Sequence, residues 1–241
     1  MRSVRMVGAE NRGLFKRFWF QEFSAGGGMV TQIFSQRLGA MIAYLGCRTG
    51  ISPNLLTLFA LATSLGGSLL YAFGSPGWMT VVLCALMYQV AYGFDCSDGQ
   101  LARATRRSSA YGGWLDVMAD LISLLVMAFA LLYWLIATRG DSNWIIFSGP
   151  LAIAIGRVLV LYSSKFTEGV SHVDRPGYGG SVGKKLLWFV IDTPTLLLVA
   201  CFLREFPILL NSYLIFMGGL YCLNAAYLGF TRLPRHCEGG E

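Results

Sequence analysis

The chain has 241 residues, a length that allows one compact domain or two very small ones. Apolar residues make up 55% of it and charged residues 13%, about half of the roughly 25% usual in soluble globular proteins. These proportions exclude disordered, collagen-like and coiled-coil proteins and argue against a soluble enzyme. With so apolar a composition, the net charge of +6 indicates a membrane protein with Lys and Arg on one side, so no nucleic-acid partner is expected.

The N-terminal region contains two amphipathic stretches rather than a spanning segment. The first interleaves aromatic residues with Lys16 and Arg17, and the second, residues 29–47, carries Arg37 within an apolar run. Helices of this kind lie in the headgroup plane with their basic residues toward anionic lipid. We therefore expect an N-terminal amphipathic interfacial helix; the alternative is a helix packed on the cytoplasmic ends of the bundle.

Six apolar segments follow, each close to the ~20 residues that cross a bilayer as a helix. They cover residues 54–74, 78–95, 112–137, 143–163, 185–203 and 208–230. The predicted fold is therefore an all-α integral membrane protein with six transmembrane helices. Residues 1–53 form a cytoplasmic or interfacial segment, 54–230 the transmembrane domain and 231–241 a cytoplasmic tail.

The distribution of Lys and Arg predicts the orientation. Sixteen of the nineteen lie in the N-terminal region, the second and fourth connections and the C-terminal tail. Only Arg139 and Arg204 lie on the opposite side, and Arg157 falls inside the fourth segment. By the positive-inside rule, both termini face the cytoplasm.

Four of the seven Asp residues lie between positions 95 and 120. Asp95 and Asp98 are three residues apart at the end of one apolar segment, while Asp116 and Asp120 are four apart at the start of the next. On helices, each pair shares one face, so both pairs should meet at the cytoplasmic edge of the membrane.

Such a cluster needs compensating charge. One ionised residue at mid-bilayer costs about 2.5 to 3.5 kcal/mol on insertion scales, and neighbouring carboxylates also repel one another. Hard oxygen ligands select Mg²⁺, Mn²⁺ or Ca²⁺ over zinc. A pair of divalent ions bridged by shared carboxylates would neutralise the cluster.

Small and basic residues beside the acids point to phosphate. Gly99 would let a phosphate approach the backbone, and Gly112 would let two helices approach each other. Arg103 follows the small Ala102 and could bind phosphate oxygens with its guanidinium fork. Together with metals, this set is suited to phosphoryl transfer.

The acids and their neighbours resemble a family signature. The pattern D-x2-D-G-x2-A-R-x8-G-x3-D-x3-D of the CDP-alcohol phosphotransferase family is met at every fixed position, by Asp95, Asp98, Gly99, Ala102, Arg103, Gly112, Asp116 and Asp120. The resemblance implies a membrane enzyme that moves a substituted phosphate from a CDP-linked donor to a hydroxyl acceptor and releases CMP, as in phospholipid biosynthesis. It also implies a homodimer with an active site facing the cytoplasm.

The resemblance implies a role for each matched residue. Asp95, Asp98 and Asp116 would ligate two Mg²⁺ or Mn²⁺ ions, and Asp120 would touch the second ion and act as general base. The donor's CDP group would be bound by Gly99, Ala102, Arg103 and Gly112, together with Pro53, Asn54 and Thr57, which resemble the family's P-N-x-x-T stretch near the cytidine.

The acceptor-binding residues are less clear from sequence. Arg157, Arg175, Lys184 and Lys185 could hold a phosphorylated acceptor. The three outside the fourth segment could instead be ordinary positive-inside residues, and Arg157 could pair with a carboxylate or extend toward the interface. Asp192, in the fifth segment, receives no role.

Other functions compete with the leading one. CDP-diacylglycerol is the favoured donor, but a soluble CDP-polyol or CDP-amino-alcohol with a lipid acceptor is an alternative. A divalent-cation transporter is the rival from another class. The transporter is disfavoured because the acids gather at one edge of the membrane and because Gly99 and Arg103 suit phosphate binding.

Overall fold

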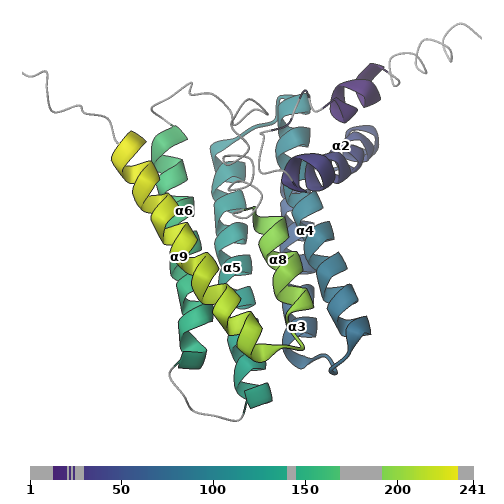
Figure 1. The fold of residues 1–241 in the computed structure, drawn as a ribbon. Helices are drawn as coiled ribbons and strands as arrows, with labels where there is room; N and C mark the ends of the chain where they lie inside the picture. The colour runs from purple at the N-terminus through teal and green to yellow at the C-terminus, as the bar shows by residue number, and fades with distance from the viewer. Residues whose placement is uncertain are drawn as a thin grey trace, which may run out of the picture.

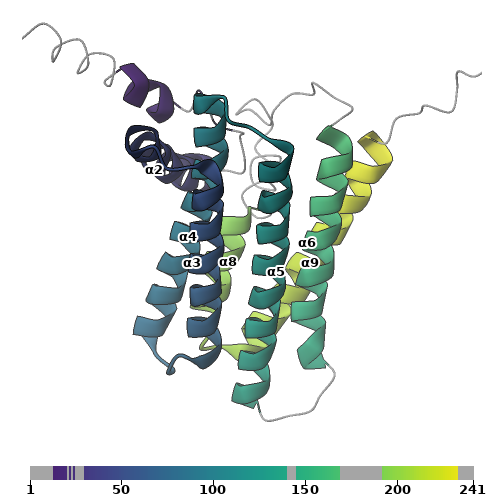
Figure 2. The same cartoon turned by 180° about the vertical axis from the view of Figure 1, so that it is seen from behind.

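The structure, a computed structural model, describes residues 13–20, 22, 24, 30–139, 145–168 and 192–232. Within this part every regular element is helical and there is no strand, which confirms the all-α prediction. The elements are η1 (Thr31–Ser35), α2 (Gln36–Thr49), α3 (Pro53–Phe73), α4 (Trp78–Thr105), α5 (Ala110–Arg139), α6 (Ile145–Glu168), α8 (Thr193–Phe202) and α9 (Pro207–Arg232). Helices α3 to α9 form an upright bundle, and α2 lies across one end of it (Figures 1 and 2).

Four of these helices are long and apolar enough to cross a membrane. They are α3, α4, the segment Ala110–Thr138 of α5 and the segment Pro207–Tyr227 of α9. The described apolar part of α6, Ile146–Tyr162, is shorter, and α8 has only ten residues. The described residues therefore support a helical membrane protein with four candidate spans, and the other two of the six predicted spans stay a prediction.

Local sequence signals fix the start of α3. The Ser52 side chain accepts a hydrogen bond from the Leu55 backbone N–H at 3.3 Å, and Pro53 occupies the first helical position. Ser at the N-cap with Pro directly after it is a favoured helix start, because the cap satisfies an otherwise unpaired N–H and Pro has none to satisfy. Before it, α2 ends at Gly50, whose φ of +77° suits glycine. The sequence thus separates the crossing helix from the first spanning helix.

Small residues let α6 and α9 pack closely. A Cβ on Gly218 of α9 would lie 2.5 Å from the Cβ of Ala152, and one on Gly156 would lie 2.8 Å from the Gly218 carbonyl oxygen. Real side chains do not tolerate such distances, so both positions require glycine for this contact. The small residues of the fourth apolar segment are therefore used for packing within the chain.

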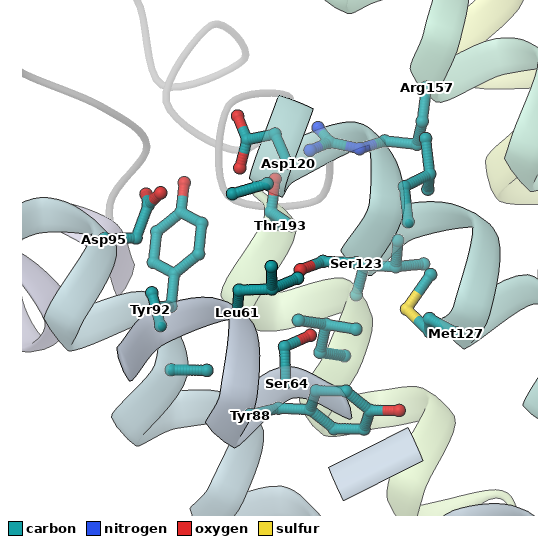
Figure 3. A pocket seen from close by; sticks show the side chains of 16 residues that line it. Leu61, Ser64, Tyr88, Tyr92, Asp95, Asp120, Ser123, Met127, Arg157 and Thr193 are labelled. Atoms are coloured by element: carbon teal, nitrogen blue, oxygen red, sulfur yellow. The ribbon is translucent and has the colours of Figure 1, made fainter. Parts of the chain in front are cut away.

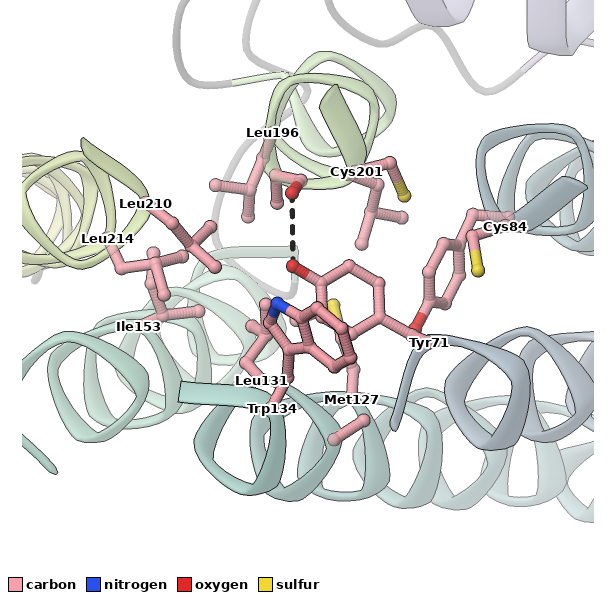
Figure 4. Close-up of a cluster of buried hydrophobic side chains, with 14 of the residues drawn as sticks. Tyr71, Cys84, Met127, Leu131, Trp134, Ile153, Leu196, Cys201, Leu210 and Leu214 are labelled. Carbon is pink, nitrogen blue, oxygen red and sulfur yellow. Dashed lines mark hydrogen bonds between the residues drawn. The ribbon is translucent and has the colours of Figure 1, made fainter. Parts of the chain in front are cut away.

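A buried core fills the bundle toward the end opposite α2 (Figure 4). Tyr71 of α3 is 1% exposed and donates its hydroxyl hydrogen to the Ala200 carbonyl of α8 at 3.1 Å. Trp134 of α5 is buried beside it. The core thus joins helices that are far apart in the sequence, including the short α8.

Arg204, in the connection between α8 and α9, closes this end. Its side chain is fully buried and donates hydrogen bonds to the carbonyls of Tyr71 at 3.1 Å and Gly74 at 2.6 Å. Its guanidinium carbon lies 3.4 Å from the centroid of a Trp134 ring, and Trp134 Nε1 donates to the Arg204 carbonyl at 2.7 Å. One cation therefore connects α3, α5 and the α8–α9 connection.

The first amphipathic stretch packs partly on the protein. Residues 13–19 are helical, and Phe18 is fully buried in a cluster with Ala40, Ala43, Leu56 and Leu101. Phe20, by contrast, is 78% exposed. The Arg37 guanidinium carbon lies 5.1 Å from a Trp19 ring centroid. One face of this segment thus packs against α2, while another face exposes apolar groups such as Phe20 and basic groups such as Lys16.

We predict that Arg204→Met destabilises the protein by about 2 to 4 kcal/mol, because the carbonyls that receive its hydrogen bonds would stay buried without a donor. Unfolding of the detergent-solubilised protein, followed by circular dichroism, measures the change. Arg48→Met, at an exposed arginine on α2, is the control and should shift the unfolding midpoint little. Equal losses of stability in the two variants would contradict the proposed contribution of the buried Arg204 hydrogen bonds.

Candidate active site

Two helices position the four carboxylates at the α2 end of the bundle. Asp95 and Asp98 lie near the end of α4, and Asp116 and Asp120 lie near the start of α5. Carboxylate oxygens of Asp95, Asp116 and Asp120 all lie within 4.8 Å of one another. The structure therefore brings the two pairs together, as the sequence spacing predicts.

Asp98 takes a different position from the other three acids. It is 6% exposed, and its Oδ2 accepts a hydrogen bond from Thr57 Oγ1 of α3 at 2.5 Å. This bond joins the Pro53-to-Thr57 stretch to the signature on α4. Two motifs that are 41 residues apart in the sequence thus belong to one site.

Asp98 and Asp116 face a polar pocket of about 540 Å³. It contains all the residues predicted to bind the donor: Pro53, Asn54, Thr57, Gly99, Ala102, Arg103 and Gly112. Four further residues line it that the sequence analysis did not single out: Arg107, Ser108, Ser109 and Gly113. All four lie in or just beyond the connection between α4 and α5, where the signature fixes no residue. The sequence did carry a signal for them, because one cation and two hydroxyl groups lie between the two acid pairs.

Gly112 allows α5 to start close to α3. A Cβ there would lie 3.1 Å from Asn54 Oδ1 and 3.2 Å from Ser109 Oγ. Ser109 also caps the new helix, since its hydroxyl accepts the Gly112 N–H at 3.0 Å. At Gly99, a Cβ would lie 3.0 Å from Nη1 of Arg103, so the guanidinium lies directly over this glycine. Gly112 therefore allows the helices around the pocket to approach closely, and Gly99 leaves room for the Arg103 guanidinium.

Asp95 and Asp120 face a second pocket of about 650 Å³, inside the bundle (Figure 3). At one end lie these two carboxylates, Arg157 of α6 and Thr193 of α8; most of the remaining lining is apolar. Tyr92, three residues before Asp95, and Ser123, three after Asp120, also line it. Their helical spacing from the acids was the signal that could have identified them.

Arg157 has an unsatisfied donor. Its guanidinium carbon lies 5.3 Å from the Tyr221 ring centroid, and its Nε is buried without a hydrogen-bond partner among the described residues. A buried donor without a partner costs about 1 to 3 kcal/mol. An anionic or hydroxylated ligand in the pocket would remove that cost. The other predicted acceptor residues, Arg175, Lys184 and Lys185, lie outside the described residues.

The acids have the chemistry that a divalent ion requires. They offer only carboxylate oxygens, which suit Mg²⁺ or Mn²⁺ better than zinc. Three of them can direct oxygens into one space, and the fourth is adjacent. Both histidines of the chain, His172 and His236, lie outside the described residues, and the described group of candidate ligands consists of carboxylates.

Comparisons with known proteins agree with this arrangement. A family model described as CDP-alcohol phosphatidyltransferase matches residues 50–219. The phosphatidylinositol phosphate synthase of Streptomyces avermitilis is 31% identical over 129 residues, 52% of this chain and 49% of that protein. The CDP-diacylglycerol–glycerol-3-phosphate 3-phosphatidyltransferase of Pectobacterium atrosepticum is 36% identical over 109 residues, 45% and 55% of the two chains. This chain thus spans about half the length of these relatives.

Solved structures show the same fold. Mycobacterium tuberculosis phosphatidylinositol phosphate synthase with CDP-DAG bound aligns with a TM-score of 0.59 at 21% identity, over 87% of this chain and 99% of that one. The same enzyme in complex with manganese and citrate aligns with a TM-score of 0.58 at 20% identity, over 84% and 93%. At these identities the likeness establishes the fold alone.

We predict that the wild-type protein binds Mn²⁺ and that Asp116→Asn weakens the binding at least about tenfold, since Asp116 lines the polar pocket and also belongs to the three-carboxylate group. The loss of free Mn²⁺ signal in electron paramagnetic resonance measures binding. Glu22→Gln removes an exposed carboxylate that pairs with Arg17 and should leave it unchanged. Wild-type affinity in Asp116→Asn would rule out this set of ligands.

Proposed function

Because the chain belongs to the CDP-alcohol phosphatidyltransferase family, we propose that it transfers a substituted phosphate from a CDP-linked donor to a hydroxyl acceptor and releases CMP. The observation that carries the proposal is the position of the acids between two pockets. A polar pocket with Arg103 and Arg107 lies on one side, and a largely apolar pocket with Arg157 lies on the other. A donor and an acceptor could meet at the carboxylates.

The polar pocket would hold the cytidine diphosphate. Gly99 and Ala102 leave room for phosphate beside α4, and Arg103 supplies a guanidinium that can bind two phosphate oxygens. Pro53, Asn54 and Thr57 of α3, with Gly112 of α5, would form the cytidine side. Arg107, at the rim, would add a second positive charge for the diphosphate.

Asp95, Asp98 and Asp116 would hold two divalent ions, and Asp120 would touch the second. Bound there, the ions would stabilise the charge that develops on the phosphate and on the leaving CMP. The Thr57 hydroxyl, which donates to Asp98, would fix the orientation of one carboxylate.

Asp120 would act as the general base. It is exposed toward the second pocket, where an acceptor hydroxyl could reach it. The acceptor oxygen would attack the phosphorus distal to cytidine, in line with the leaving CMP, while the Asp120 carboxylate takes the hydroxyl proton.

CDP-diacylglycerol remains the favoured donor, with a polar alcohol as acceptor. The CDP-DAG complex of the mycobacterial enzyme supports this choice, and Arg157 would bind the acceptor through its unsatisfied Nε. Arg175, Lys184 and Lys185 would add positive charge on the same side. The apolar lining of the second pocket supports one alternative, a soluble CDP-polyol or CDP-amino-alcohol with a lipid acceptor.

The membrane arrangement extends the fold described above. We propose six transmembrane helices, with α6 and α8 as the described parts of the fourth and fifth, and with the site and both termini on the cytoplasmic side. Helix α2 would lie at the interface, because Met41 and Leu45 are exposed on it together with Arg37 and Arg48, and Phe34 is exposed on η1 just before it. The homodimer follows from the family resemblance, and light scattering in detergent tests it.

Purified protein in detergent should release CMP from CDP-diacylglycerol only when Mg²⁺ or Mn²⁺ and the right acceptor are present. A panel of glycerol phosphate, inositol, inositol phosphate, serine and amino-alcohols identifies the acceptor. A parallel panel of CDP-amino-alcohols with diacylglycerol tests the alternative donor class. Metal-dependent uptake into proteoliposomes without CMP release from any donor would instead indicate a transporter.

We predict that Asp120→Asn retains donor binding but lowers transfer by at least about a hundredfold, as expected when a general base is removed. Binding of radiolabelled CDP-diacylglycerol and release of CMP measure the two steps separately. Thr138→Val, on the same helix but in neither pocket, serves as the control, because the Thr138 hydroxyl bonds to carbonyls of α5; this variant should retain most of the activity. Full activity in Asp120→Asn would remove the base assignment.

A further inference from the structure

Asp192, just before α8, bonds to a residue 161 positions earlier in the chain. Its Oδ2 accepts the backbone N–H of Thr31 at 2.8 Å, and its Oδ1 accepts the Thr31 hydroxyl at 2.5 Å. The two residues are 6% and 3% exposed, respectively. Both oxygens of one buried carboxylate thus hold Thr31, and the Val30 backbone N–H also bonds to this carboxylate.

Thr31 begins η1, a single π-helical turn that leads directly into α2. Val30, the residue before η1, also has helical φ and ψ and provides no side-chain cap. Asp192 therefore anchors the η1–α2 segment from a distant part of the chain.

The segment held in this way packs on the turns of α4 that carry two of the site carboxylates. A Cβ on Gly39 would lie 2.9 Å from Cys96 Cβ and 3.1 Å from the Ser97 backbone nitrogen, so α2 touches the backbone next to Asp95. Gln100 Nε2 donates to the carbonyl and side-chain oxygens of Gln36, at 3.0 and 2.6 Å. Residues before and after Asp98 in the chain, Ser97 and Gln100, are therefore both in contact with α2.

The same carboxylate lies beside the second pocket. Thr193, the next residue, lines that pocket with Asp95 and Asp120 (Figure 3). Gln89 Nε2 of α4 donates to the Pro194 carbonyl at 3.0 Å, which joins α8 to α4 six residues before Asp95. A closed series of contacts, from α8 through Thr31 and α2 to α4 and back to α8, thus includes the part of α4 that carries Asp95.

We propose that Asp192 is a positioning residue of the active site: by holding Thr31, it keeps α2 pressed on α4 and so keeps Asp95 and Asp98 in place against the carboxylates of α5. This inference rests on the metal site of the proposed function. Burying a carboxylate near a membrane costs free energy. At Asp192 this cost would be offset by the positioning of the metal ligands Asp95 and Asp98.

Mn²⁺ binding to the full chain in detergent tests the proposal. Thr31→Val is isosteric, keeps the backbone N–H bond and removes only the hydroxyl bond to Asp192. We expect it to weaken Mn²⁺ binding roughly tenfold, the lower end of the loss seen when outer partners of metal ligands are removed. Thr31→Ser should restore wild-type affinity, and Asp192→Asn should weaken binding at least as much as Thr31→Val.

Thr49→Val is the matched control, because Thr49 ends α2, the helix that follows η1, and its hydroxyl bonds to the α2 carbonyls of Leu45 and Gly46. It should leave Mn²⁺ affinity unchanged. The melting temperature of each variant is recorded as well, so that a loss of stability can be distinguished from a loss of metal-ligand positioning. If Thr31→Val and Asp192→Asn bind Mn²⁺ like the wild type, even with lower melting temperatures, the contact is merely structural and the inference is wrong. If the wild type binds no Mn²⁺ and releases no CMP, the proposed function fails as well.

Discussion

Repulsion among carboxylates at one end of an apolar bundle is the constraint on which the rest of the structure depends. Like charges about 5 Å apart repel by roughly 3 kcal/mol at an effective dielectric constant of about 20. Three of the acids have oxygens within 4.8 Å of one another, so the bundle must hold α4 and α5 together against this force. Helix α3 does so by packing against both, and the Thr57–Asp98 bond and the close approach at Gly112 mark those contacts. Bound divalent cations would turn the repulsion into attraction.

Two arginines within the fold show how the ends of the bundle differ. Arg204 is fully buried, and backbone carbonyls and an aromatic ring surround it. Its charge is compensated within the protein, since Nη1 also lies 3.0 Å from Oε1 of Glu205. Arg157 stands over a ring as well, yet its buried Nε has no partner among the described residues, and it lines a pocket with two carboxylates. Arginine is therefore fully engaged within the protein at one end of the bundle, whereas at the other end an arginine keeps one buried donor without a partner among the described residues.

The sequence predicted the chemistry of the site better than its surroundings. Regular spacing on two adjacent helices was enough to bring Asp95, Asp116 and Asp120 together, and the Pro53–Thr57 stretch lies beside the signature as expected. Helical periodicity carries that information because it depends on neighbours in the chain. The contact between Thr31 and Asp192 could not be predicted, since nothing local links residues 161 positions apart. The brevity of α8 was equally hidden, because apolar composition alone does not show where a helix begins.

The separation of the acids within each pair explains why the site uses two pairs rather than one run of carboxylates. Asp98 lies three residues further along the same face of α4 than Asp95, and it lines the polar pocket whereas Asp95 lines the apolar one. On α5, Asp116 lines the polar pocket, and Asp120, four residues further along, lines the apolar one. Each helix thus contributes one carboxylate to each pocket, so that the acids are shared between the two pockets. A phosphorus atom bound among these carboxylates would have its leaving group toward one pocket and an attacking hydroxyl toward the other, which is the arrangement that in-line transfer requires.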